Sequence, residues 1–173
     1  MPINATIEGS TVGDIINGTT ASDVIAAGSG SDRVVAAAGD DVVYGGTGSD
    51  KIYGGEGNDV LYGNAGSDRL YGGSGSDTIV GGIGDDVLYG DNASDGNDNE
   101  GFSDTFVFSI DDGNDKILDF ETGLDLIQFI DGSAADLTFA YKGAATVITY
   151  GQTTITVFDA HLDADDIGTW LLF

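Results

Sequence analysis

Aspartate recurs at every ninth residue through the first half of the chain. The first nine members are Asp14, Asp23, Asp32, Asp41, Asp50, Asp59, Asp68, Asp77 and Asp86. The same phase continues through Asp95 and Asp104. An aliphatic residue stands two positions after each of the first nine, namely Ile16, Ile25, Val34, Val43, Ile52, Leu61, Leu70, Ile79 and Leu88. Because a fixed short period is typical of stacked repeats, this pattern favours a solenoid over an ordinary globular domain.

Glycine fills the positions before these aspartates. The fullest segments are GGTGSD (45–50), GGEGND (54–59), GGSGSD (72–77) and GGIGDD (81–86). The repeat is therefore GGxGxDxUx, where U is aliphatic. Six glycine-rich residues can turn tightly with positive φ, and three residues with an aliphatic centre suit a short strand. We expect each unit to be one turn and one three-residue strand.

The residues on either side of the aliphatic position are polar or aromatic. Side chains alternate across a strand, so an inward aliphatic residue places its neighbours outward. The outward neighbours are Arg33, Lys51, Arg69 and Thr78 before it, and Tyr44, Tyr53, Tyr62, Tyr71 and Tyr89 after it. Two units would form one coil, and stacked coils would enclose the aliphatic residues between two parallel sheets. The sequence predicts an all-β fold, a right-handed parallel β-roll.

Aspartates two repeats apart would lie above one another in such a roll. Asp32, Asp50, Asp68 and Asp86 would line one edge, and Asp23, Asp41, Asp59 and Asp77 the other. Adjacent carboxylates would repel by about 1 kcal/mol in water and by more where solvent is partly excluded, and a divalent cation between them would reverse this. Calcium accepts six to eight oxygens, including carbonyls, whereas magnesium demands stricter octahedral geometry. With no Cys and one His, thiolate sites are excluded and zinc is disfavoured. The alternative is that the aspartates form side-chain turns.

The repeat resembles that of the RTX (repeat-in-toxin) or hemolysin-type calcium-binding family over residues 9–104. This resemblance implies several Ca²⁺ ions, each held by repeat positions 2, 4 and 6 of one turn and positions 1, 3 and 6 of the turn two repeats on. The residues that it places at calcium sites are Asp23, Gly28, Gly30, Asp32, Gly39, Asp41, Gly45, Gly46, Thr47, Gly48, Asp50, Gly54, Gly55, Glu56, Gly57, Asp59, Gly63, Asn64, Ala65, Gly66, Asp68, Gly72, Gly73, Ser74, Gly75, Asp77, Gly81, Gly82, Ile83, Gly84, Asp86, Gly90, Asn92, Asp95 and Asp104. Val12 and Ala21 replace the fourth-position glycine near the start, and GDNASD (90–95) lacks it near the end, so weak or absent sites are expected at both ends of the repeats.

The composition changes near residue 100. All eight Phe residues and the only Trp follow it, which indicates a conventional core in this part. We expect residues 1–104 to form the roll and residues 105–173 to form a β-rich cap over its open end, because an exposed sheet edge promotes aggregation. LTFAYKG, ATVITYG and TTITVFD predict three short strands joined by glycine turns.

The stretch from 104 to 129 resembles the segment that follows the repeats in serralysin-type proteases and other type I secretion substrates. Within it, Asp112 and Asp115 are candidates for a last calcium site, and a solvated acidic loop is the alternative. The ending HLDADDIGTWLLF resembles an uncleaved type I secretion signal, unless it is only a structural terminus. MPINATIEGS lacks a charged and an apolar region, and no apolar run approaches a membrane span of ~20 residues. The resemblance implies a secreted bacterial protein that uses the type I machinery.

The charge and motifs narrow the function. Thirty acidic residues against five basic ones give a net charge of -25, which disfavours nucleic acid. The chain has no HExxH and no GxSxG, and His161 is its only histidine, so we do not expect an enzyme. The leading hypothesis is a calcium-dependent folding and secretion module. One alternative is an accessory polysaccharide-binding module of a secreted hydrolase or polysaccharide-modifying enzyme, with Arg33, Lys51, Arg69 and the tyrosines holding the polymer. The other is a surface-layer or matrix protein that self-associates through calcium.

Overall fold

The structure is a computed structural model that describes residues 6–91, 101–132, 136–158, 162 and 171–172. In these ranges the regular elements are strands, and no helix is long and apolar enough to span a membrane. The strands are β1 (Thr6–Ser10), β2 (Ile15–Asn17), β3 (Val24–Ser29), β4 (Arg33–Ala38), β5 (Val42–Thr47), β6 (Lys51–Glu56), β7 (Val60–Ala65), β8 (Arg69–Ser74), β9 (Thr78–Ile83), β10 (Val87–Tyr89), β11 (Thr105–Phe108), β12 (Asn114–Ile117), β13 (Leu126–Phe129), β14 (Leu137–Lys142), β15 (Ala145–Tyr150), β16 (Thr153–Val157) and β17 (Leu171–Leu172).

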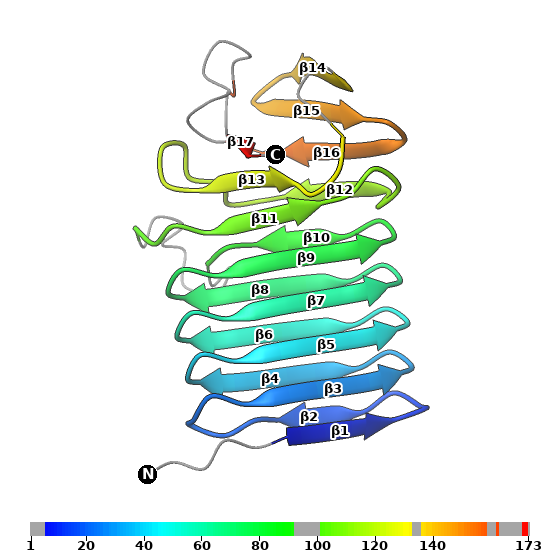
Figure 1. Ribbon diagram of the computed structural model, residues 1–173, viewed down its shortest axis with the longest axis vertical. Coiled ribbons are helices and arrows are strands. Elements are labelled where there is room, and N and C mark those ends of the chain that lie inside the picture. Colours follow the sequence, from blue (N-terminus) through cyan, green and yellow to red (C-terminus); the bar gives the residue numbers. More distant parts are fainter. Residues whose placement is uncertain (1–5, 92–100, 133–135, 159–161, 163–170, 173) are drawn as a thin grey trace.

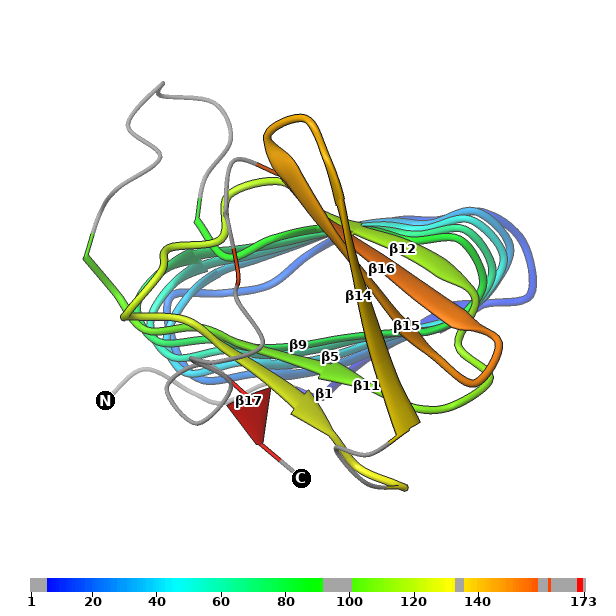
Figure 2. The same cartoon turned by 90° about the horizontal axis from the view of Figure 1, so that it is seen from above.

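From β1 to β13, consecutive strands alternate between two facing sheets (Figure 1). The first sheet has the order β1-β3-β5-β7-β9-β11-β13-β17, and the second β14-β15-β16-β12-β10-β8-β6-β4-β2. Viewed along the stack, the repeat strands superpose into two layers joined by turns at both edges (Figure 2). The chain is therefore a parallel β-roll, as predicted.

Each repeat strand pairs with the strand two repeats on. Val43 lies opposite Leu61, and the ladder continues through Gly46 and Asn64 to Thr47 and Ala65. The strands consequently reach six residues, twice the predicted length, because parallel neighbours also satisfy the backbone groups of the second and third repeat positions. Asn64 occupies a second position at φ 73°, a conformation that Asn tolerates better than most side chains.

The core is a ladder of the aliphatic residues at the eighth repeat position. From Ile25 to Leu88 every member is fully buried. The first repeat position also faces inward, and it is Ala27 and Ala36 in two early turns and glycine in later ones. The same cluster extends into the carboxy-terminal third through Phe106, Ile117 and other residues, so one continuous core runs along the stack.

The parallel stack continues beyond the regular repeats, but out of phase with them. Asp104 follows Asp77 after 27 residues, Asp115 follows Asp86 after 29, and Asp125 follows Asp104 after 21. The segments GNDKI (113–117) and GLDLI (123–127) keep the GxDxU part of the repeat, and both glycines have positive φ. These two turns were not predicted as repeats.

The three strands predicted in the carboxy-terminal third are confirmed as β14, β15 and β16. They form an antiparallel meander, and β16 attaches it to the roll by pairing in parallel with β12. Seen from above, β14 and β15 cross the open end of the two layers (Figure 2). Leu137 and Phe139 of β14 pack against the core cluster, and Tyr150 of β15 is fully buried within it.

Candidate metal centre

A row of aspartates lies along each edge of the roll, immediately before or at the start of a strand. Asp14, Asp32, Asp50, Asp68, Asp86 and Asp115 lead into the second sheet. Asp23, Asp41, Asp59, Asp77, Asp104 and Asp125 lead into the first. Apart from Asp14, all these side chains are only 1% to 3% exposed. Such burial is unusual for a carboxylate and requires compensation.

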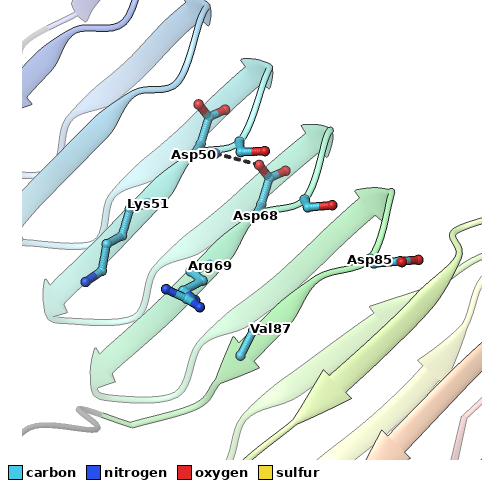
Figure 3. Close-up of a pocket in the computed structure, with 8 residues that line it drawn as sticks. Asp50, Lys51, Asp68, Arg69, Asp85 and Val87 are labelled. Atoms are coloured by element: carbon cyan, nitrogen blue, oxygen red, sulfur yellow. Dashed lines mark hydrogen bonds between the residues drawn. The ribbon is translucent and has the colours of Figure 1, made fainter.

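Repeats that lie above one another on the same edge form the rungs of the stack. From Asp32 onward, one carboxylate oxygen of each aspartate in the two rows accepts a hydrogen bond from the rung below. The backbone N–H of Asp50 donates to Oδ1 of Asp68 at 2.8 Å, as the dashed line in Figure 3 shows. The N–H of Asp59 donates in the same way to Oδ1 of Asp77 at 2.7 Å. This bond recurs along both edges and fixes the carboxylates one rung apart.

The second carboxylate oxygen separates two classes of aspartate. Oδ2 is buried and has no hydrogen-bond partner in Asp32, Asp41, Asp50, Asp59, Asp68, Asp77, Asp86 and Asp115. By contrast, Oδ2 of Asp14 accepts the N–H of Ser10, and Oδ2 of Asp23 accepts that of Thr19. The side-chain-turn interpretation therefore describes Asp14, Asp23 and also Asp125, whose Oδ2 accepts the N–H of Glu121. The eight aspartates with an unpartnered Oδ2 instead present an oxygen that still needs a positive partner.

First-position glycines bring this oxygen next to a carbonyl of the following rung. A Cβ on Gly63 would lie 2.5 Å from Oδ2 of Asp68 and 2.5 Å from the carbonyl oxygen of Gly81. On Gly72 the corresponding distances, to Asp77 and Gly90, are both 2.3 Å. Two oxygens thus converge where only a glycine hydrogen fits.

Fourth-position glycines are required by backbone conformation as well as by space. Gly48 has a φ of 125°, and a Cβ there would lie 1.8 Å from the carbonyl oxygen of Gly30 one rung below. Its N–H donates at 2.9 Å to the third-position carbonyl of Ala65. The same bond is accepted by the third-position carbonyls of Thr47, Glu56, Ser74 and Ile83. The predicted ligands thus lie in stacked turns of the same geometry.

Two predicted ligands, Asn92 and Asp95, lie outside the described residues. The nine-residue period predicts Asp95 as the aspartate one rung above Asp77. In the structure Asp104 takes this place, and the N–H of Asp77 donates to Oδ1 of Asp104 at 2.8 Å. Asp104 therefore lies on the same edge as Asp77, although a spacing of two regular repeats would place it above Asp86 on the other edge. Asp115 takes the place after Asp86 and accepts its N–H at 2.9 Å. The signal for Asp115 was GNDKI, a partial repeat in a different phase.

Burial raises the pKa of the stacked carboxyls. It raises the pKa of Asp68 to about 6, and those of Asp59, Asp77 and Asp86 to about 7. Desolvation is the largest cause, and the neighbouring aspartate in the stack raises each pKa further. Ionised carboxylates are therefore unfavourable in these rows unless a cation compensates them.

The donors present fit calcium. Among the described residues, no three Asp, Glu, His or Cys side chains gather in a group that could hold a metal by themselves. Each gap between rungs instead offers two carboxylates, and the remaining donors are backbone carbonyls. Calcium accepts this mixed oxygen set, whereas zinc favours nitrogen and sulfur.

A family comparison agrees with this donor set. The RTX calcium-binding nonapeptide repeat matches in four copies, at residues 8–43, 35–70, 44–79 and 62–99, which together cover more than half of the chain. The chain belongs to the RTX calcium-binding nonapeptide repeat family. Repeats of this family bind calcium. No curated protein sequence matches the chain.

Two solved structures were found to be similar to the chain. The extracellular lipase LipA from Serratia marcescens matches with a TM-score of 0.52 at 20% identity, over all of this chain and 40% of the lipase. The chain thus spans well under half of that protein. The AlgE6R2 subunit of the Azotobacter vinelandii mannuronan C5-epimerase matches with a TM-score of 0.48 at 24% identity, over 76% of this chain and 91% of that subunit. The lipase match supports the fold alone.

Proposed function

We propose that this RTX roll is a calcium-dependent folding module of a bacterial protein exported by the type I machinery. The observation that carries the proposal is the row of buried Oδ2 atoms without hydrogen-bond partners, stacked one rung apart from Asp32 to Asp86 on one edge and from Asp41 to Asp77 on the other. A buried anionic oxygen without a partner is strongly destabilising. Folding of the ionised chain therefore requires cations at these positions.

One gap illustrates the ligands. Asp50 would contribute its free oxygen together with the carbonyls of Gly46 and Gly48, and the next rung would contribute Gly63, Ala65 and Asp68. The backbone N–H of Asp50 holds the Asp68 carboxylate in place through Oδ1. Calcium would supply the positive charge that compensates both carboxylates. Because each aspartate lies between two gaps, neighbouring sites share ligands, and we expect them to fill cooperatively.

The calcium-free state follows from the composition. Twenty-nine glycines lose much conformational entropy on ordering, and a net charge of -25 opposes compaction. An unfolded chain of this kind can pass through a secretion channel. Extracellular calcium sites commonly have dissociation constants of about 10⁻⁴ to 10⁻³ M, so the roll would fold after export. Residues 105–173 would then cover the end of the roll and carry the export signal.

A calcium titration tests the proposal. Far-ultraviolet circular dichroism of chelator-treated protein should gain β signal steeply with calcium and not with magnesium at the same ionic strength. Asp50→Asn should shift the midpoint to higher calcium, because it removes one charge shared by two gaps. Glu56→Gln should not, because it removes an exposed side-chain charge and keeps the backbone carbonyl that is the predicted ligand. A chelated protein with full β signal at pH 8 would refute calcium-dependent folding.

A second candidate function rests on the outer face of the second sheet. Four of the five cationic residues form one row across adjacent strands of this face, in a chain that is otherwise strongly acidic. They are Arg33, Lys51, Arg69 and Lys116, interrupted by Val87. Beside them Tyr53, Tyr71 and Tyr89 stack at 4.8 and 4.6 Å between ring centroids. Lys51 and Arg69 also line a surface hollow of about 270 Å³, whose other charged lining residues are Asp50, Asp68 and Asp85 (Figure 3).

This face has the charge to bind a polysaccharide that carries carboxylates. Isothermal titration of the calcium-loaded protein with soluble oligouronates should show binding that weakens with salt, because exposed ion pairs are screened. The double variant Lys51→Ala/Arg69→Ala should lose it, whereas Lys142→Ala, which removes the cation outside the row, should not. Equal binding of neutral oligosaccharides would argue against this function.

A further inference from the structure

The unit IDDGNDKIL (110–118) continues one edge of the roll beyond the matched repeats, which end at residue 99. Its Gly113 lies above Gly84, and its Asp115 above Asp86. The spacing is 29 residues, longer than two regular repeats. Sequence periodicity therefore does not reveal this rung, although the chain places it in register with the others.

Three contacts reproduce the geometry of a regular rung. Gly113 has a φ of 123°, and a Cβ there would lie 2.0 Å from the Gly84 carbonyl, as fourth-position glycines lie above one another lower in the stack. The N–H of Gly84 donates to the carbonyl of Asp112 at 2.6 Å, which is the bond that Gly66 makes to Ile83. The N–H of Asp86 donates to Oδ1 of Asp115 at 2.9 Å.

The gap between these rungs also contains unsatisfied oxygens. Oδ2 of Asp86 and Oδ2 of Asp115 are both buried without a hydrogen-bond partner, and each side chain is 1% exposed. Asp111, in contrast, is an exposed residue of the same loop. The side chain of Asp112 is already used, because its Oδ2 accepts the N–H of Ser109 at 2.6 Å. Only its carbonyl is directed along the stack.

We propose that Asp86 and Asp115, with the carbonyls of Gly82, Gly84 and Asp112, bind one further calcium ion at the junction between the roll and its carboxy-terminal third. This site rests on the proposed function, since it uses the same chemistry, but it lies in a turn that the family repeat does not match. The carbonyl of the next rung approaches Gly81 less closely than it approaches Gly63 and Gly72, because the three atoms nearest to a Cβ on Gly81 all belong to Asp86. The junction site should therefore fill last as calcium is raised.

The ion would join the antiparallel meander to the roll. Asn114 to Ile117 of β12 pair with Thr154 to Val157 of β16, and the N–H of Thr154 donates to the Gly113 carbonyl at 2.7 Å. The rung that closes the calcium site thus carries the strand that anchors β14 and β15. Occupancy of the junction site should stabilise this meander separately from the regular coils.

The test compares three isosteric variants of the full chain at saturating calcium. Asp115→Asn keeps an oxygen for the N–H of Asp86 but removes the charge, Asp111→Asn removes an exposed charge from the same loop, and Asp50→Asn alters a regular gap. Native mass spectrometry counts the bound ions. Hydrogen exchange of residues 51–65 and 153–157 locates any loss of structure.

We expect Asp115→Asn to bind one ion fewer than wild type and to lose protection at 153–157 but not at 51–65, whereas Asp111→Asn matches wild type. The same ion count in Asp115→Asn and Asp111→Asn would overturn the junction site. So would a loss of several ions in Asp115→Asn, since a terminal rung borders one gap. If Asp50→Asn also kept every ion, the proposed calcium module itself would fail, and the two failures are thus distinguishable.

Discussion

Replacing Asp59 by asparagine should have opposite effects with and without calcium. Asp59 is 1% exposed and lies in the middle of one edge. Its Oδ1 accepts the N–H of Asp41 at 2.8 Å, and its own N–H donates to Asp77 at 2.7 Å. Asparagine can keep both bonds, because its amide oxygen also accepts and the backbone donor is unchanged. The substitution therefore removes the charge and leaves the rung geometry.

Two magnitudes follow. In calcium at about 100 times the dissociation constant, one site contributes about 2.7 kcal/mol to the free energy of unfolding, so impairing the two gaps that share Asp59 costs up to about 5 kcal/mol. That is comparable with the net stability of a small domain. Without calcium, burial raises the pKa of Asp59 to about 7. Removing this ionised group at pH 8 should then stabilise the calcium-free roll by about 2 to 4 kcal/mol.

Urea unfolding followed by circular dichroism measures the calcium-loaded effect, and the pH midpoint for folding in chelator measures the calcium-free one. Asp59→Asn should lower the urea midpoint in calcium and raise the pH below which the calcium-free chain folds. Glu56→Gln is the matched control, since the side chain of Glu56 is exposed in the same turn. Destabilisation by the same amount in both conditions would refute the reasoning, because Asp59 would then act only through its hydrogen bonds.

Three further predictions concern pH, the core and the turns. Burial raises the pKa of Asp77 to about 7 and that of Asp104 to about 8, above the value of about 4 in an unfolded chain, so the folded state binds more protons between these limits. The stability of the calcium-free roll should accordingly be full below pH 4 and fall as pH rises through 7 to 8, which circular dichroism in chelator from pH 4 to 8 would show. Leu61→Ala empties a fully buried position and should cost about 2–5 kcal/mol in urea unfolding with calcium present, a result that a loss below about 1 kcal/mol would contradict. Gly66→Ala should prevent calcium-induced folding, because the φ of 140° is strained for alanine and its Cβ would lie 1.5 Å from the Gly48 carbonyl; Ser67→Ala in the same turn should fold normally.

The ninefold period predicted the roll because each repeat encodes both its turn and its inward residue. The fully buried ladder from Ile25 to Leu88 is the expected consequence of an aliphatic residue two positions after each aspartate. The strand length was underestimated, because glycine has a low β-propensity and its pairing comes from the neighbouring coil. This backbone pairing forms only when coils stack, so the sequence of a single repeat does not predict it.

The two rows of aspartates were predictable from the sequence, but the hydrogen bonding of each carboxylate was not. Asp23 and Asp59 have the same place in the repeat, yet Oδ2 of Asp23 accepts the N–H of Thr19, while Oδ2 of Asp59 has no hydrogen-bond partner. Thr19 stands at the second repeat position, where the later repeats have a residue of positive φ, a glycine in most of them and Ala37 or Asn64 in two, so the local backbone decides between a turn and an open ligand. The nine-residue period does not predict Asp115, because the longer segment before it separates it from Asp86 by 29 residues. Its strand nevertheless pairs in register with the strand of the rung below.

Small-angle X-ray scattering with and without calcium tests calcium-dependent folding most directly. A compact chain of 173 residues has an expected radius of gyration of about 16 Å, and an unfolded one about 44 Å. We predict a radius above about 35 Å in chelator at pH 8, and a fall to between about 16 Å and about 20 Å in millimolar calcium but not in magnesium. An equally compact radius in chelator would contradict the account, since the roll would then fold without any cation along its aspartate rows.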